Sequence, residues 1–218
     1  MKFVEKVDNT EIHHEGELVY RKQSKFQLIE IFDTVDFGRI LMLDNEVQLT
    51  TSDEKIYHTA LTKELLNKEI HSLLIIGGGD GGALREACAI LNKDVTIDLV
   101  ELDPDVISAC REHLPTLSNG AFDDPRVTIY NEDGFKFIEN THNRYDAIII
   151  DLNDRVELFY DKTLSEIVVA LKDDGMLICY LGIGNKMTGN VLFKSTEFYR
   201  IVVPSFVFGY TWFSINRL

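Results

Sequence analysis

A run of six residues, GGGDGG at positions 77–82, combines backbone freedom with a single carboxylate. The apolar residues 73–76 before it predict a buried parallel strand, and residues 83–91 after it have helical character. Glycines at such a junction let backbone N–H groups approach a ligand closely, as they do in nucleotide-binding loops. Asp80 inside the loop would repel a phosphate and attract a cation. The loop therefore predicts a site for a nucleoside that carries positive charge.

Acidic residues also follow the later strands that the sequence predicts. The carboxyl ends of parallel strands meet at one edge of a sheet, and ligands bind there. Any one of these acids would be unremarkable as a helix cap or a loop residue, but acids at successive strand ends favour a binding site. The first of them lies where an acid commonly binds ribose hydroxyls. These strand-end residues, with one adjoining glycine, are Glu101, Asp133, Gly134, Asp151 and Asp154.

A nicotinamide-dependent dehydrogenase is the first alternative, because Gly77, Gly79 and Gly82 satisfy the pattern G-x-G-x-x-G. That pattern alone is weak evidence. A pyrophosphate beside Asp80 would be unfavourable, and Asp151 would have no role in such a site. We therefore disfavour the dehydrogenase.

The elements that must position these side chains form two groups. Residues 1–52 predict a small antiparallel β-strand domain with a turn at 44–45. Residues 53–218 alternate strands with helices, which predicts an α/β fold with a Rossmann-like doubly wound sheet of the class I methyltransferase type, binding a nucleoside. The expected strands are 72–76, 95–101, 127–131, 147–151 and 176–181; the expected helices are 83–91, 104–113, 134–140 and 161–171; and a terminal hairpin covers 200–206 and 210–217.

Composition limits the classes of partner. The net charge of −14 at pH 7 disfavours nucleic acid, because binding it depends on neutralising phosphates. The same charge would attract cationic substrates, although solubility alone also explains it. The sequence has no apolar run long enough to span a membrane, and residues 1–5 lack the features of a signal peptide. We therefore expect a cytoplasmic protein with no membrane partner.

The remaining reactive residue types do not predict a metal site. Cys88, Cys110 and Cys179 are odd in number and have no metal-ligand spacing, so reduced thiols are expected. The HHE run at 13–15 has ligand-like residues but lacks distant partners. We interpret His58 as a packed helix residue, and we expect no metal.

Several motifs together resemble the spermidine synthase family of aminopropyltransferases. The apolar strand followed by GGGDGG is the most specific of them. The resemblance covers nearly the whole chain in order. The other motifs are SKFQ at 24–27, FGRILMLD at 37–44, VQLT at 47–50, DE at 53–54, YH at 57–58, LRE at 84–86, VELD at 100–103, DPRV at 124–127, EDG at 132–134 and YDAIIID at 145–151.

The resemblance implies that decarboxylated S-adenosylmethionine is the co-substrate and that no separate cofactor is used. Asp80 would hold the aminopropyl amine of this donor, and Glu101 would bind its ribose hydroxyls. Asp133 would accept a hydrogen bond from the adenine amine, with Gly134 alongside. The remaining residues of the donor pocket would be Gln27, Gln48, Gly77 and Gly79.

On the acceptor side, the resemblance implies that Asp151 is the general base and that Tyr57 and Asp154 position a diamine such as putrescine. A base is needed because an alkylammonium, with a pKa of about 10, cannot attack while it is protonated. The released product would be 5′-methylthioadenosine. The family also implies a homodimer or a larger homo-oligomer.

Two further alternatives stay open, because the acceptor side departs from the usual family pattern at Tyr180 and Phe206. The first is a methyltransferase-like enzyme that uses S-adenosylmethionine. Ile75 and Ile76 stand where such enzymes usually carry an acid, and the carboxylate of that donor would face Asp80. The second is a noncatalytic protein that binds a nucleoside or a polyamine.

Overall fold

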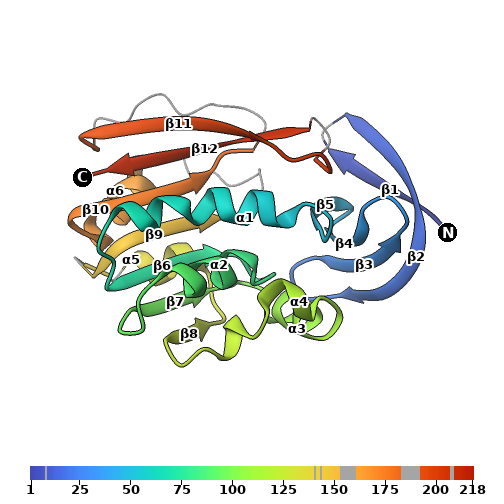
Figure 1. Ribbon diagram of the computed structural model, residues 1–218, viewed down its shortest axis with the longest axis horizontal. Helices are drawn as coiled ribbons and strands as arrows, with labels where there is room; N and C mark the ends of the chain where they lie inside the picture. Colours follow the sequence, from blue (N-terminus) through green and yellow to red (C-terminus); the bar gives the residue numbers. More distant parts are fainter. Residues whose placement is uncertain (8, 140, 143, 153–160, 183–191, 207–208) are drawn as a thin grey trace.

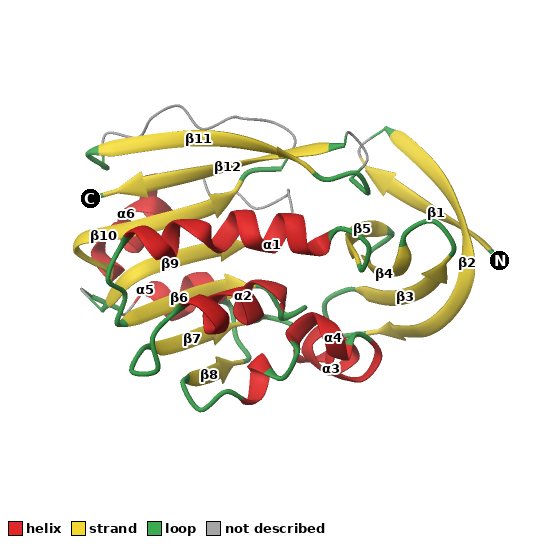
Figure 2. Cartoon of the chain, viewed as in Figure 1, coloured by secondary structure: helices red, strands yellow, loops and turns green. Residues whose placement is uncertain are grey.

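The computed structural model describes residues 1–218 apart from 8, 140, 143, 153–160, 183–191 and 207–208. Two sheets organise the described chain (Figures 1 and 2). An antiparallel sheet near the N-terminus lies beside a larger mixed sheet, which has helices on both faces. The doubly wound α/β fold and the antiparallel N-terminal sheet predicted from the sequence are confirmed.

The N-terminal sheet is built from consecutive antiparallel strands in chain order. Asp44 and Asn45 join its last two strands with φ angles of 49° and 67°. Positive φ at both central residues defines the tight hairpin turn that matches strand twist, and Asp and Asn tolerate that conformation. The predicted turn is therefore confirmed. The strands are β1 (Lys2–Val7), β2 (Thr10–Gln23), β3 (Leu28–Thr34), β4 (Gly38–Leu43) and β5 (Glu46–Thr50).

The larger sheet has the order β11-β12-β10-β9-β6-β7-β8. Its strands from β10 to β8 are parallel, and the hairpin β11–β12 pairs antiparallel at one end. The strands are β6 (Ser72–Gly77), β7 (Thr96–Val100), β8 (Val127–Tyr130), β9 (Tyr145–Asp151), β10 (Leu171–Tyr180), β11 (Ser195–Val202) and β12 (Tyr210–Arg217).

Two of these strands, β10 and β11, begin five residues earlier than the sequence predicts, and β11 ends at Val202 instead of 206. β10 begins at Leu171, and its pairing with β9 shifts register between Leu171 and Met176. The intervening KDDG segment contains a glycine and two acids. The sequence pattern does not predict a strand there, because such residues are rare in regular strands. β11 begins at Ser195, ahead of the predicted position, because its alternating polar side chains suit an edge strand.

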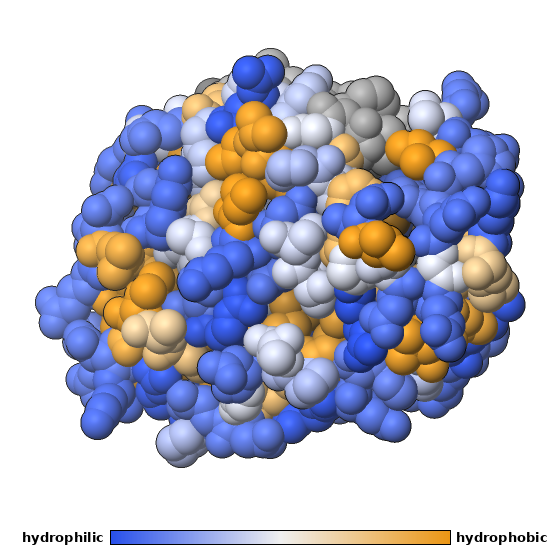
Figure 3. Space-filling view, turned by 45° about the vertical axis from the view of Figure 1, so that its right-hand side comes forward, coloured by the Kyte–Doolittle hydropathy of each residue, from blue (hydrophilic) through white to orange (hydrophobic). Residues whose placement is uncertain are grey.

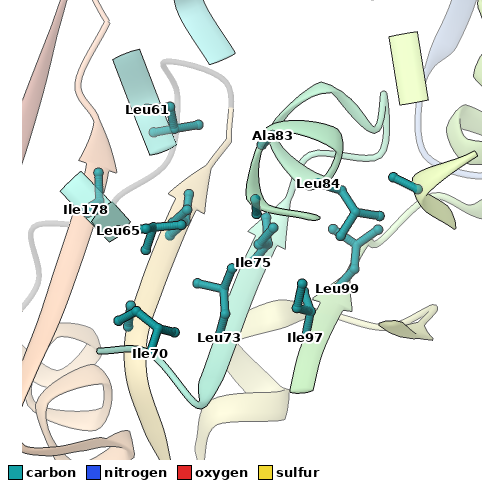
Figure 4. Packing of buried hydrophobic residues seen from close by; sticks show 14 of the residues in the cluster. Leu61, Leu65, Ile70, Leu73, Ile75, Ala83, Leu84, Ile97, Leu99 and Ile178 are labelled. Carbon is teal, nitrogen blue, oxygen red and sulfur yellow. The ribbon is translucent and has the colours of Figure 1, made fainter. Parts of the chain in front are cut away.

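Helices close both faces of the larger sheet. On one face, Leu61 and Leu65 lie beside Ile178, and Ala83 and Leu84 lie beside Ile75 and Leu99, all in one buried cluster (Figure 4). A second buried cluster on the other face includes Ile148 of β9. Both central strands, β6 and β9, are buried along almost their whole length, which explains their continuous apolar sequences. The helices are α1 (Glu54–Thr62), α2 (Gly82–Ile90), α3 (Pro104–His113), α4 (Pro115–Ser118), α5 (Gly134–Glu139), α6 (Asp161–Ala170), and the short 3₁₀ helices η1 (Lys63–Asn67) and η2 (Ala121–Asp123).

The surface is predominantly hydrophilic on the face in Figure 3, where hydrophobic residues gather in separate patches. Among the described helices, none combines the length and the hydropathy needed to cross a bilayer. The three cysteines are free; Cys110 and Cys179 are buried and Cys88 is partly buried.

A buried aspartate, Asp146, ties β9 to the start of β6 and to β10. Its Oδ2 accepts hydrogen bonds from the backbone N–H groups of His71 and Ser72 and from the Ser72 hydroxyl, each at 2.9 Å. Lys172 Nζ donates to the same oxygen at 2.9 Å. Burial alone would raise the pKa of Asp146, but Lys172 and these hydrogen bonds lower it.

We predict that Asp146→Ala lowers the free energy of unfolding by about 2–3 kcal/mol, because it leaves buried donors without their acceptor. Since the folded-state pKa of Asp146 is lowered, the difference from the original chain should be largest at neutral pH and shrink as the pH falls below its ordinary value. Denaturant unfolding at several pH values measures this. Asp173→Ala, on an exposed position of the same strand, is the control and should change little. Equal effects of the two substitutions would contradict the assignment.

Candidate active site

The glycine loop lies at the switch point of the larger sheet. The chain leaves β6 toward β7 and β8, then returns to β9 on the other side of β6. Gly77 at the end of β6 is in register with Asp151 at the end of β9. Open α/β sheets bind ligands in the crevice formed where the strand order reverses. The glycine loop and Asp151, which the sequence analysis identified separately, therefore lie together at the switch point.

Two glycines are required here by close approach. A Cβ on Gly77 would lie 2.1 Å from the carbonyl oxygen of Asp151, and the φ of Gly77 is +80°. A Cβ on Gly79 would lie 2.6 Å from a carboxylate oxygen of Glu101. Because neither residue has a side chain, the loop contacts the ends of both neighbouring strands directly.

Asp80 is held in the loop by its own backbone and by a histidine. Its Oδ1 accepts a hydrogen bond from the Gly82 N–H at 2.6 Å and lies 3.4 Å from Nε2 of His58. Burial alone would raise the pKa of Asp80, but the charge of His58 and these hydrogen bonds outweigh it and lower the pKa. Asp80 is therefore a carboxylate at neutral pH and attracts a cation.

His58 belongs to this cluster and is almost completely buried, with a 1% exposed side chain. Its Nδ1 lies 2.7 Å from Oε2 of Glu54, one helical turn earlier on α1. Burial opposes its protonation, but Asp80 and Glu54 together raise its pKa to about 10. His58 is therefore a packed residue of α1, as predicted, and it is in addition charged at neutral pH. The available signal was the E-x-x-x-H spacing, which places Glu54 and His58 on one helix face.

Asp151 lies at the end of β9 and has one engaged and one unengaged oxygen. Its Oδ1 accepts a hydrogen bond from the Tyr57 hydroxyl. Its Oδ2 is buried and has no hydrogen-bond partner among the described residues. Burial and the nearby charge of Asp80 raise the pKa of Asp151 to about 6. The unengaged oxygen is suited to accept a proton from a ligand.

An aromatic wall surrounds the Tyr57 ring. Its centroid lies 5.4 Å from those of Tyr180 and Phe213, and 5.9 Å from that of Phe206. Two of these residues, Tyr180 and Phe206, are among the departures from the usual family pattern. Apolar walls beside buried carboxylates favour a ligand with a hydrocarbon segment and a charged end.

Glu101 follows β7 at the same edge of the sheet as Asp80 and Asp151. It accepts hydrogen bonds from the backbone N–H groups of Gly79 at 3.0 Å and Asp103 at 2.9 Å. Burial raises its pKa to about 7 despite these hydrogen bonds. Asp103 in turn accepts hydrogen bonds from Ser24 Oγ at 2.6 Å and Gln27 Nε2 at 3.1 Å. The N-terminal sheet therefore contributes Gln27 to the surroundings of Glu101.

The other expected site residues are placed less directly. Asp133 Oδ1 accepts from the Phe135 N–H at 2.9 Å and so caps the start of α5. Gly134 begins that helix, where a Cβ would lie 2.3 Å from Ile76. Gln48 donates to the Glu46 carbonyl on its own strand at 3.2 Å. Asp154 lies outside the described residues.

His58, Asp80 and Asp151 each bring one potential ligand atom within 4.8 Å of the others. Such a cluster would suit a cation. Metal ligation by an imidazole requires a free nitrogen lone pair, whereas the two ring nitrogens of His58 face carboxylate oxygens of Glu54 and Asp80. The arrangement therefore favours an organic ammonium group, which needs carboxylates alone.

Comparison with known proteins gives a consistent result. The family model described as the spermine/spermidine synthase domain matches residues 50–216, and the one described as the spermidine synthase tetramerisation domain matches residues 16–51. The polyamine aminopropyltransferase of Methanocaldococcus jannaschii is 41% identical over 169 residues, 74% of this chain and 57% of the relative. Polyamine aminopropyltransferase 1 of Aquifex aeolicus is 35% identical over 234 residues, 98% of this chain and 82% of the relative.

Solved structures agree with these relatives. A spermidine synthase in complex with the transition state analogue AdoDATO has a TM-score of 0.91 and 29% identity, covering 100% of this chain and 80% of that one. The spermidine synthase of Thermotoga maritima has a TM-score of 0.88 and 28% identity, covering 100% and 79%.

The fold, the two partly buried carboxylates of Asp80 and Asp151 and these relatives define an enzyme of the aminopropyltransferase class. The chain belongs to the spermine/spermidine synthase family. It spans 57% of the length of one relative and 82% of another.

We predict that His58 stays protonated well above neutral pH, with a midpoint of about 10. NMR titration of the imidazole resonances measures this, with His58→Gln identifying the signal. Because the folded-state pKa is raised, stability from the charged ring is fully present below the ordinary value of about 6.5 and is lost as the pH rises through 10. A midpoint near the ordinary histidine value would contradict the proposed charge state.

Proposed function

We propose that this enzyme transfers an aminopropyl group from decarboxylated S-adenosylmethionine to a diamine such as putrescine and releases 5′-methylthioadenosine. The observation that carries the proposal is the buried Oδ2 of Asp151, which has no partner among the described residues although Oδ1 is held by Tyr57. Such an oxygen fits a base that awaits a substrate proton. The named reaction of the relatives is consistent with this role.

The donor would lie across the glycine loop. Its terminal ammonium would pair with Asp80, and its ribose hydroxyls would bind Glu101, which Gly79 and Asp103 already orient. Asp133 and Gly134 would lie near the adenine. Gln27 would support this pocket through Asp103, and we assign Gln48 to the same pocket.

The acceptor would lie between Asp151 and the aromatic wall, with Tyr57 and Asp154 positioning it. Its nitrogen attacks the methylene carbon beside the sulfonium, so that a C–N bond forms and the C–S bond breaks. The bonding electron pair returns to sulfur as a neutral thioether, and the proton leaving the amine goes to Asp151. Two cations held in one buried acidic crevice supply most of the orientation.

A homo-oligomer is expected, because residues 16–51, which include the second part of β2 and all of β3 to β5, match a tetramerisation domain. We propose a dimer or larger assembly in which the N-terminal sheets meet. The net charge of −14 supports small cations rather than nucleic acid as partners, and we place the enzyme in the cytoplasm.

We predict that the purified protein forms 5′-methylthioadenosine from the decarboxylated donor and a diamine, and that Asp151→Asn lowers kcat by about 10²–10⁴-fold because it removes the base. Calorimetry with 5′-methylthioadenosine should give the same affinity for both proteins. Donor-dependent methyl transfer from S-adenosylmethionine would favour the methyltransferase alternative. Nucleoside binding without turnover on any amine would favour the noncatalytic alternative.

We predict that kcat/KM falls as the pH drops through about 6, because Asp151 must be ionised to accept a proton. The Tyr57 hydroxyl stabilises the ionised form, so Tyr57→Phe should move this acid limb to higher pH. Tyr199→Phe is the matched control, because the Tyr199 hydroxyl donates to the Ala60 carbonyl and its ring stacks on Phe213. An acid limb that shifts equally in both variants, or in neither, would remove this role of Tyr57.

A further inference from the structure

A closed ring of alternating charges surrounds the start of α2. Asp80 in the glycine loop faces His58, His58 binds Glu54, and Glu54 binds Arg85 on α2. Asp80 also caps the first turn of α2 through the Gly82 N–H, which completes the ring through the backbone. The ring joins α1, the glycine loop and α2, although the proposed function uses only Asp80.

The two ring nitrogens of His58 lie at different distances from their carboxylate partners. Nδ1 lies 2.7 Å from Glu54, within the range of a strong charge-assisted hydrogen bond. Nε2 lies 3.4 Å from Asp80, well outside that range. The imidazolium is therefore held more closely by Glu54, although the charge of Asp80 also acts on it.

Glu54 is held in place by Arg85, which keeps its carboxylate close to the His58 ring. Arg85 donates to both of its oxygens, each at 3.0 Å. The Arg85 guanidinium also donates to the Leu117 carbonyl at 2.7 Å. Burial would raise the pKa of Glu54, but His58 and Arg85 lower it to about 2, so its charge persists at any working pH.

We infer that Glu54 is a positioning residue for the amine end of the donor: by holding the His58 ring, it keeps that ring from closing onto Asp80. A nearby positive charge keeps Asp80 ionised, while its carboxylate remains available to a primary ammonium. Without the Glu54 charge, His58 would have Asp80 as its remaining carboxylate in the ring and would compete with the ammonium for it. This inference rests on the proposed function, because it concerns the same donor.

The chain offers a matched control in Glu86. Its Oε1 accepts hydrogen bonds from Arg85 at 2.9 and 3.0 Å, and its side chain is 15% exposed, against 12% for Glu54. Glu54→Gln and Glu86→Gln therefore remove the same charge, from similar depth, from the same arginine. Of these two glutamates, Glu54 is the one that binds His58.

The test uses calorimetry with two ligands. Decarboxylated S-adenosylmethionine carries the primary amine, whereas 5′-methylthioadenosine contains the nucleoside without the aminopropyl group. Glu54→Gln should weaken binding of the decarboxylated donor by about ten-fold, the scale of one impaired charge-assisted hydrogen bond, and leave 5′-methylthioadenosine binding unchanged. Glu86→Gln should leave both affinities unchanged. In a His58→Gln background, the effect of Glu54→Gln should disappear, because the residue acts through the imidazolium.

Several outcomes would overturn the inference. These are equal losses of both ligands in Glu54→Gln, an equal selective loss in Glu86→Gln, and an undiminished Glu54 effect in the His58→Gln background. If Glu54→Gln does not fold, Glu54→Asp keeps the charge but shortens the reach, and it should show a smaller loss confined to the donor; an equal loss of both ligands would count against the inference. Failure of the proposed function is distinct, because the original chain would then form no 5′-methylthioadenosine from the decarboxylated donor and any diamine, whichever ligands it binds.

Discussion

A carboxylate removed from water must keep a compensating charge or hydrogen-bond donors, and this active site holds two such carboxylates close together. Asp80 and Asp151 end adjacent segments at the switch point, and each raises the free energy of ionising the other. His58 supplies the positive charge, Gly82 supplies an amide to Asp80, and Tyr57 supplies a hydroxyl to Asp151. Tyr57 and His58 of α1 therefore stabilise the acidic groups of this candidate site in the absence of a bound cation.

The backbone makes this concentration of charge possible. Parallel strands converge at their carboxyl ends, so the sheet itself brings together acids that are far apart in the sequence. Glycine then removes the side chains that would separate them, as Gly77 does against Asp151 and Gly79 against Glu101. The central strands tolerate this arrangement because both faces of the sheet are closed by helices and the strands are buried. The packing of β6 and β9 therefore positions Asp151 and the glycine loop.

The sequence predicted what depends on local pattern. Continuous apolar runs located the central strands, and the glycine motif located the loop that joins β6 to α2. The charged role of His58 could not be predicted in the same way, because Glu54 is a helical neighbour but Asp80 approaches from another segment. The early start of β10 was hidden by Asp173, Asp174 and Gly175, where the register shifts. Asp133 shows a different limit of sequence-based prediction. An aspartate at this position suits both a helix cap and a nucleoside contact, so the residue type alone does not distinguish the two roles.

The hydrogen bonds from Ser24 and Gln27 to Asp103 connect the two sheets of the chain. They run from the N-terminal sheet to the residue whose backbone amide orients Glu101. The region around Glu101 is thus shared between two sheets, and its geometry depends on how they dock. Docking of the two sheets and ligand binding at Glu101 are therefore linked equilibria. If ligand binding stabilises the docked arrangement, docking must strengthen ligand binding by the same coupling free energy.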